Sequence, residues 1–275
     1  MMLKIVAKDA IVINNKNLLE GMIKMRKPII AGNWKMFKTR DEALYFVLQV
    51  SEKMPNNKDV ETICFAQAPL MRCLIKRQGA NLRIGAQNLH FEDEGAFTGE
   101  VSGPLLKSYN VEYVLIGHSE RRALFHETDE IVNLKLKAAL RNSLKPIVCV
   151  GELLEERENN QTEVVLRRQV KAAFKDIAAI NLKNIVIAYE PVWAIGTGKT
   201  ASANQADEAC GFIRELIAAL YGKVVAEAIR IQYGGSVKPD NIVELLEKEN
   251  IDGALIGGAS LDPDKFIFMA NAAKK

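Results

Sequence analysis

The chain has 275 residues, of which 48% are hydrophobic and 26% are charged, a composition typical of soluble globular proteins and not of disordered or membrane-spanning ones. The first 26 residues account for the formal net charge of +3, because they hold five of the 37 basic and two of the 34 acidic residues. The rest of the chain is neutral, which argues against nucleic acid as the main partner, since phosphate-backbone binding needs a concentrated basic surface. No apolar run is long enough to span a bilayer, so we expect no membrane partner either.

The first 24 residues differ from everything that follows them. They contain one short apolar run, 10–13, which is followed by polar NNKN and by no small-residue cleavage site of the kind found in secretory signals. Two acidic residues and the absence of arginine before Arg26 also argue against a mitochondrial signal. We therefore predict two parts: a disordered or dispensable N-terminal extension over 1–24, and one catalytic domain over 25–275.

From residue 28 onward, short apolar segments typical of buried strands alternate with segments typical of helices. The eight predicted strands cover 28–32, 62–66, 82–86, 111–116, 146–150, 185–189, 229–233 and 254–256. The predicted helices cover 40–53, 69–78, 104–109, 130–141, 163–179, 203–220, 239–247 and 263–273. Helix-start signals include Thr39, the capping box from Ser202 to Gln205, and Pro239 and Pro263 near first-turn positions.

This alternation predicts the class of fold. Continuously apolar strands that alternate with helices indicate a parallel sheet covered on both faces. Eight strand–helix units of roughly 30 residues fit an α/β protein with one closed (β/α)8 barrel as a single domain. An open, doubly wound sheet is the alternative, but no G-x-G-x-x-G follows the first strand.

The four cysteines indicate in which cellular compartment the protein is expected. Cys64, Cys73, Cys149 and Cys210 form no C-x-x-C pair and lie in apolar surroundings such as PIVCV. Buried free thiols of this kind are typical of a reducing environment. We therefore expect four buried thiols and a cytoplasmic protein.

Active sites of such barrels lie where the strands end, so polar residues at those points are candidates for one shared site. GNWK follows the first strand and directs Asn33 and Lys35 to one side with Trp34 turned away, because side chains at a strand end alternate. GHSERR follows the fourth strand and contains His118 among ionisable neighbours. Glu190 follows the sixth strand, where we expect an exposed but rigidly aimed carboxylate. Taken singly, Lys35 could be a solvated charge and His118 a capping or core histidine.

The segment AYEPVWAIGTGKT, 188–200, continues from Glu190 into what resembles a closable lid. Pro191 stiffens the exit from the strand, while Gly196 and Gly198 supply backbone freedom at the far end of an apolar loop. Such a loop can cover a site and expel water, which suits an intermediate that water would destroy. The alternative is an ordinary surface loop after a core strand.

Two pairs of glycines follow the last two predicted strands. YGGSV, 233–237, and IGGASL, 256–261, let backbone N–H groups approach a ligand closely, and a following helix N-terminus favours an anion. One pair alone could be a tight turn, but two pairs at these positions match the phosphate site of (β/α)8 barrels. The sequence therefore predicts a phosphate cradle.

From about residue 26 to the C-terminus, the chain resembles the triosephosphate isomerases, which are TIM barrels. The resemblance rests on GNWKM, GAFTGE, GHSERR, CVGE, AYEPVWAIGTGKTA, YGGSV and IGGASL, in that family's order. It implies an isomerase that needs no cofactor and no metal. The implied reaction interconverts dihydroxyacetone phosphate and D-glyceraldehyde 3-phosphate through an enediolate, a step of glycolysis and gluconeogenesis.

The resemblance also implies a role for each residue of the site. Glu190 is the base that moves the proton, and His118 is the electrophile. Asn33 and Lys35 polarise the substrate and hold its charge. The implied phosphate-binding residues are Gly196, Ser236, Gly257 and Gly258.

The same resemblance implies a homodimer. In the family the loop that carries GAFTGE enters the partner subunit, and Phe97 is an apolar residue that a monomer would leave in water. Thr98 should then approach the partner's site. Supporting contacts are expected from Glu120 and Arg121, with Glu100 paired to Arg121 in its own chain.

Two other classes of protein remain as alternatives. Another phosphate-binding barrel, such as a sugar-phosphate epimerase or a lyase, would share the glycine pairs but need not combine His118 with Glu190. A non-catalytic binding barrel would be expected to lack Lys35, His118 or Glu190, and all three are present.

Overall fold

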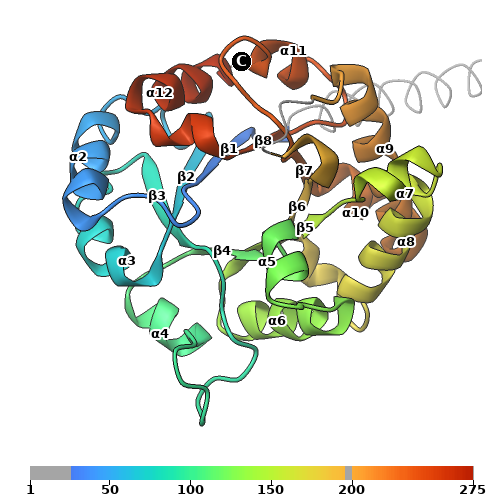
Figure 1. Ribbon diagram of the computed structural model, residues 1–275, viewed down its shortest axis with the longest axis horizontal. Coiled ribbons are helices and arrows are strands. Elements are labelled where there is room, and N and C mark those ends of the chain that lie inside the picture. The colour runs from blue at the N-terminus through green and yellow to red at the C-terminus, as the bar shows by residue number, and fades with distance from the viewer. Residues whose placement is uncertain (1–25, 196–199, 275) are drawn as a thin grey trace, which may run out of the picture.

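The computed structural model describes residues 26–195 and 200–274, and eight parallel strands in this part of the chain close into a barrel (Figure 1). Each strand pairs with the next along the chain, and β8 pairs with β1. The strands are β1 (Ile29–Asn33), β2 (Glu61–Ala66), β3 (Leu82–Ala86), β4 (Tyr113–Ile116), β5 (Lys145–Val150), β6 (Val186–Tyr189), β7 (Arg230–Tyr233) and β8 (Gly253–Ile256). The predicted single-domain (β/α)8 fold and its eight strands are confirmed.

The helices surround the barrel in Figure 1. The longer ones are α2 (Arg40–Val50), α3 (Ala68–Ile75), α6 (Asp129–Arg141), α8 (Thr162–Ala173), α9 (Ala203–Tyr221) and α12 (Pro263–Ala272). The shorter ones are α4 (Gly103–Ser108), α5 (Ser119–Leu124), α7 (Leu154–Glu158), α10 (Lys223–Ala228) and α11 (Ile242–Leu246), with 3-10 helices η1 (Ala179–Asn184), η2 (Val192–Ala194) and η3 (Gly258–Leu261). Described helices are all too short or too polar to span a membrane.

The helix boundaries follow the capping signals in most cases. The capping box before α9 is confirmed, because the Ser202 hydroxyl accepts from the Gln205 N–H and the Gln205 side chain accepts from the Ser202 N–H. The expected helix start near Pro239 is wrong: the side chain of Asn241 accepts from the Lys238 N–H, which forms a turn and delays α11 to Ile242. Helices α5, α7 and α10, each of five or six residues, were not predicted.

Two apolar layers stabilise the barrel. Alternate strand residues point inward and fill its interior, as Ile29, Ile63 and Phe65 do. Their neighbours point outward and pack against the helices. Trp34 belongs to this outer layer: it is fully buried and packs edge-on against Phe46 of α2, with ring centroids 4.9 Å apart. The prediction that Trp34 turns away from the strand end is therefore confirmed.

All four cysteines lie in the described part of the chain, and all are free thiols. Cys64, Cys149 and Cys210 are buried, and burial raises the pKa of each thiol. Cys73 is only half-buried, so the expectation of four buried thiols is wrong for this residue. It lies on α3, where its thiol donates to the Leu70 carbonyl.

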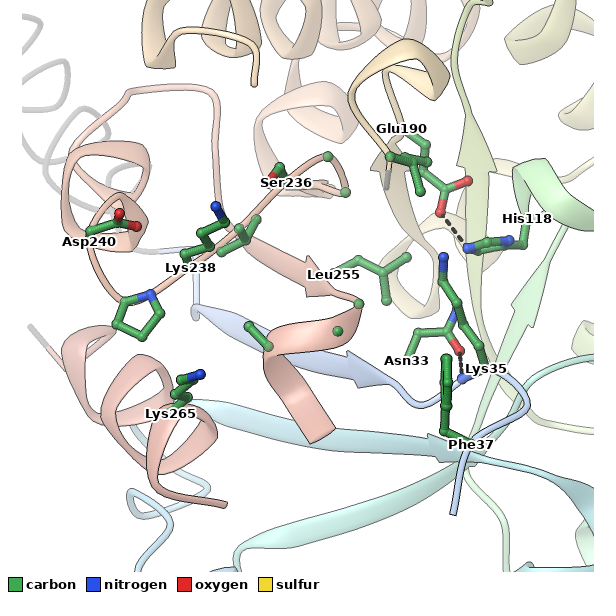
Figure 2. A pocket seen from close by; sticks show the side chains of 18 residues that line it. Asn33, Lys35, Phe37, His118, Glu190, Ser236, Lys238, Asp240, Leu255 and Lys265 are labelled. Atoms are coloured by element: carbon green, nitrogen blue, oxygen red, sulfur yellow. Dashed lines mark hydrogen bonds and ion pairs between the residues drawn. The ribbon is translucent and has the colours of Figure 1, made fainter. Parts of the chain in front are cut away.

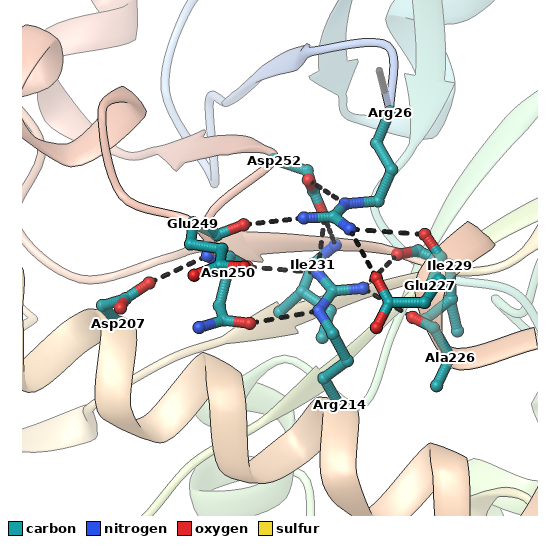
Figure 3. Close-up of polar contacts among 10 residues, drawn as sticks. All are labelled: Arg26, Asp207, Arg214, Ala226, Glu227, Ile229, Ile231, Glu249, Asn250 and Asp252. Atoms are coloured by element: carbon teal, nitrogen blue, oxygen red, sulfur yellow. Dashed lines mark hydrogen bonds and ion pairs between the residues drawn. The ribbon is translucent and has the colours of Figure 1, made fainter. Parts of the chain in front are cut away.

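A network of buried ions joins the first described residue to the amino-terminal ends of β7 and β8 (Figure 3). The Asp252 carboxylate accepts from Arg26 at 2.5 Å, from Arg214 at 2.9 Å and from the Ile231 N–H at 2.8 Å. Arg26 also donates to the Glu249 carbonyl at 2.6 Å. Because Asp252 and Arg214 are both buried, each needs the other to offset its loss of hydration.

We predict that Asp252→Ala lowers the free energy of unfolding by about 3–5 kcal/mol, because it leaves a buried guanidinium without its carboxylate. Urea denaturation at fixed protein concentration measures the change. Arg40→Ala is the control: its ion pair with Asp41 is exposed and is worth less than about 1 kcal/mol. Equal, small changes in both variants would contradict the prediction.

Candidate active site

A cavity of about 750 Å³ opens at the carboxyl-terminal ends of the strands (Figure 2). The four site residues predicted at the ends of β1, β4 and β6 all line it: Asn33, Lys35, His118 and Glu190. The glycine-rich loops after β7 and β8 form its opposite wall. The fold therefore brings the polar strand ends together with the predicted phosphate cradle.

Glu190 is fixed by the backbone at the end of β6. Its N–H donates to the Val150 carbonyl at 2.7 Å, and a Cβ at Gly151 would come within 1.7 Å of the Glu190 carbonyl oxygen. The expectation of an exposed carboxylate is wrong, because the neighbouring loops leave Glu190 only 2% exposed. Its Oε2 accepts from the Ser119 N–H at 3.0 Å, and its Oε1 lies 3.2 Å from Nε2 of His118.

His118 stands at the N-cap of α5, and its hydrogen bonds define its tautomer. Nδ1 accepts from the Glu120 N–H at 3.2 Å, so in the neutral ring the proton resides on Nε2. That N–H points at the carboxylate of Glu190 (Figure 2). The imidazole thus offers the cavity a hydrogen-bond donor.

Asn33 and Lys35 lie together at the end of β1. The Asn33 side-chain oxygen accepts from the Lys35 N–H at 3.0 Å (Figure 2). Lys35 has a φ of 51°, a left-handed conformation that is uncommon for residues other than glycine. Its Nζ lies 2.6 Å from Oε1 of Glu120, so the residue that fixes His118 also contacts the ammonium group.

Arg121 has a partner other than the predicted one. It pairs with the buried carboxylate of Glu127, and it also stacks on Phe125. Glu100 makes no ion pair within the described part of the chain. The expected Glu100–Arg121 pair is therefore wrong, because Glu127, which lies six residues after Arg121 in the sequence, binds the guanidinium instead.

Three of the four predicted phosphate-binding residues line the cavity: Ser236, Gly257 and Gly258. A Cβ at Gly258 would meet no atom within 4 Å, so packing does not require a glycine there. The open space faces the cavity, and its use by a ligand would explain the glycine. Gly196 lies outside the described residues, and Thr98 lies exposed in the loop between β3 and α4.

The first part of the predicted lid forms η2 and hydrogen-bonds to Glu152, a residue for which no role was predicted. Trp193 Nε1 donates to Glu152 Oε1 at 2.9 Å, and the Tyr189 hydroxyl donates to the same oxygen at 3.0 Å. Burial and this carboxylate raise the pKa of Tyr189. The CVGE motif was a signal for Glu152, but only the fold brings it to the lid.

The barrel, the carboxylate–imidazole pair and the glycine cradle define an enzyme of the phosphate-binding (β/α)8 class that carries out acid–base chemistry. Residues 28–273 match the family model described as triosephosphate isomerase. The chain is 52% identical over 248 residues to the triosephosphate isomerase of Lactiplantibacillus plantarum, covering 90% of this chain and 98% of the relative. It is 54% identical over 246 residues to that of Carboxydothermus hydrogenoformans, covering 88% and 97%. The chain belongs to the triosephosphate isomerase family, and it is an isomerase.

Proposed function

We propose that Glu190, His118, Lys35 and Asn33 carry out the family's reaction in this chain. The reaction is the interconversion of dihydroxyacetone phosphate and D-glyceraldehyde 3-phosphate. The observation that carries the assignment of roles is the contact of 3.2 Å between Nε2 of His118 and Oε1 of Glu190. This contact places a base, Glu190, and a hydrogen-bond donor, His118, side by side in the cavity that Lys35 also lines.

Glu190 removes a proton from the carbon next to the substrate carbonyl and returns it to the neighbouring carbon. Such a proton is weakly acidic, so a carboxylate is an effective base only if the developing oxyanion is stabilised. In the present arrangement the N–H groups of Ser119 and His118 occupy the carboxylate. Glu190 must leave them to reach a substrate carbon, and the lid that follows at Pro191 provides the movement.

His118 and Lys35 stabilise the oxyanion of the enediolate. The Nε2–H of His118 forms a hydrogen bond to the substrate oxygen, and the ammonium of Lys35 supplies a positive charge. The N–H at the start of α5 binds Nδ1 of His118, so the neutral imidazole donates to the substrate through Nε2. Asn33 orients Lys35 and contributes its side-chain amide to the same wall.

The phosphate is bound by Ser236, Gly257 and Gly258, together with Gly196 of the lid. An enediolate phosphate exposed to water tends to eliminate phosphate. Apolar residues of the lid exclude water when it closes, so binding of the phosphate and protection of the intermediate occur in one motion. The alternative of a sugar-phosphate epimerase is not favoured, because similarity to the triosephosphate isomerases extends over 90% of the chain.

The proposal includes a cytoplasmic homodimer. Met36, Phe37 and Phe125 are large apolar side chains that are more than half exposed in one chain. Met36 and Phe125 border a second cavity of about 330 Å³, which also contacts Lys35 and His118. The partner's Thr98 would enter this second cavity, because its loop between β3 and α4 is exposed and carries the apolar Phe97. The free thiols support a reducing compartment.

We predict that Glu190→Asp lowers kcat by about a hundredfold while KM changes little, because a carboxylate displaced by about 1 Å loses its alignment with the substrate carbon. A coupled assay with both triose phosphates measures the rates. Glu155→Asp, the same substitution at an exposed position of α7, is the control and should keep full activity. Nearly full activity of Glu190→Asp would exclude Glu190 as the base.

We predict a particle of twice the 30.5 kDa chain mass in light scattering at assay concentration. Phe97→Asp should shift the population toward monomer and lower the activity, because an ionised side chain at the interface must be desolvated. Val224→Asp is the control, since Val224 is exposed on α10. A fully active monomer would contradict the homodimer.

We predict that residues 1–24 are dispensable for folding and activity. The family model begins at residue 28, and a chain that starts at Met25 keeps the Arg26 contacts with Asp252 and Glu249. Its activity, melting temperature and mass in solution should therefore equal those of the full chain. A loss of folding or of the assembly state would make the extension part of the working protein.

A further inference from the structure

The backbone of Lys35 has a conformation that needs an external support. Seven described residues other than glycine have a positive φ, and of these only Lys35 lines the cavity of the candidate active site. Left-handed backbone is uncommon for a side chain with a Cβ and persists where the surroundings enforce it. The direction of the Lys35 side chain depends on this turn, because φ sets the direction of the Cα–Cβ bond.

Gln87 provides the support from a distant part of the chain. It follows directly after β3, and its Nε2 donates to the Lys35 carbonyl at 2.8 Å. The same Nε2 donates to the Phe65 carbonyl at 3.1 Å, at the end of β2. One side-chain amide therefore joins the turn at Lys35 to the rigid edge of the barrel.

The other side of the Lys35 peptide is held by Asn33, which accepts from its N–H. Both backbone polar groups of Lys35 are thus bound by side-chain amides. Rotation of the Lys35 backbone to a right-handed conformation would break these hydrogen bonds. It would also turn the ammonium group away from Glu120, whose Oε1 lies 2.6 Å from Nζ. Asn33 already has an assigned role at the substrate, whereas Gln87 has none.

We propose that Gln87 is a positioning residue that maintains the left-handed turn at Lys35 and thereby directs the ammonium group into the site. The inference rests on the proposed role of Lys35 in binding and polarising the substrate. Gln87 itself acts through the two carbonyls and not on the reacting atoms.

A double-mutant cycle between Gln87→Met and Lys35→Met tests the inference. Methionine keeps the length of the side chain but removes both donors. We expect Gln87→Met to lower kcat/KM by about ten- to a hundredfold, since a 1 Å displacement of a catalytic group costs that much. In the Lys35→Met background the same substitution should change kcat/KM by less than about twofold, because coupled residues are non-additive.

Gln67→Met is the matched control. Gln67 donates through the same kind of amide to the same loop, but to the Phe37 carbonyl at 3.2 Å, two residues past Lys35. It should change kcat/KM by less than about twofold in either background. A loss in Gln67→Met equal to that in Gln87→Met would overturn the inference, since any amide contact to the loop would then suffice.

The outcomes separate this inference from the role of Lys35. A full loss caused by Gln87→Met in both backgrounds, or no loss in either, overturns the inference while the role of Lys35 stands. High activity of Lys35→Met alone overturns that role instead.

Gln87→Glu gives a second test should the methionine variant fail to fold. A neutral carboxyl can donate one hydrogen bond to a carbonyl, whereas a carboxylate donates none. The activity of Gln87→Glu relative to the unsubstituted protein should therefore rise as the pH falls through the titration of the new carboxyl group. A flat ratio would overturn the inference.

Discussion

The tight packing of three strand ends around Glu190 is the constraint on which the other parts of the site depend. The backbone of Glu190 hydrogen-bonds to β5, and the Gly234 N–H after β7 donates to the Tyr189 carbonyl at 2.7 Å. A Cβ at Gly234 would approach the Glu190 Cγ to 2.9 Å, so the loop after β7 can lie against the side chain only as glycine. The barrel itself therefore aims the carboxylate and removes most of its contact with water.

Glu120 contacts both His118 and Lys35. The hydrogen bond from the Glu120 N–H to Nδ1 of His118 caps α5, and it also decides which ring nitrogen faces the cavity. The side chain of Glu120 reaches Lys35. One residue thus links the helix start, the imidazole and the ammonium.

The sequence predicted the strands well because each is a short apolar run, and a closed barrel then determines that their ends share one face. This reasoning brought Asn33, Lys35, His118 and Glu190 into one cavity. It did not predict that Glu190 is buried, because the burial comes from loops after β5 and β7 that are distant in the chain.

The residues missed at the sequence level share one property: their contacts are distant in the chain. Glu152 meets Trp193 from 41 residues away, and Gln87 meets Lys35 from 52 residues away. The sequence around Glu152 or Gln87 contains no pattern from which its contact could be predicted. The predicted pair of Glu100 with Arg121 was wrong for the opposite reason. The true partner of Arg121, Glu127, is closer to it in the sequence than Glu100 is.

The ion network around Asp252 lies at the amino-terminal ends of the strands, whereas the cavity lies at their carboxyl-terminal ends. The two share no residue. Mutations that change thermal stability can therefore accumulate at the amino-terminal end of the barrel. The geometry of the cavity at the carboxyl-terminal end then stays under selection for catalytic rate. The barrel separates two evolutionary pressures that a smaller fold, with its active site built into the core, would have to satisfy with the same side chains.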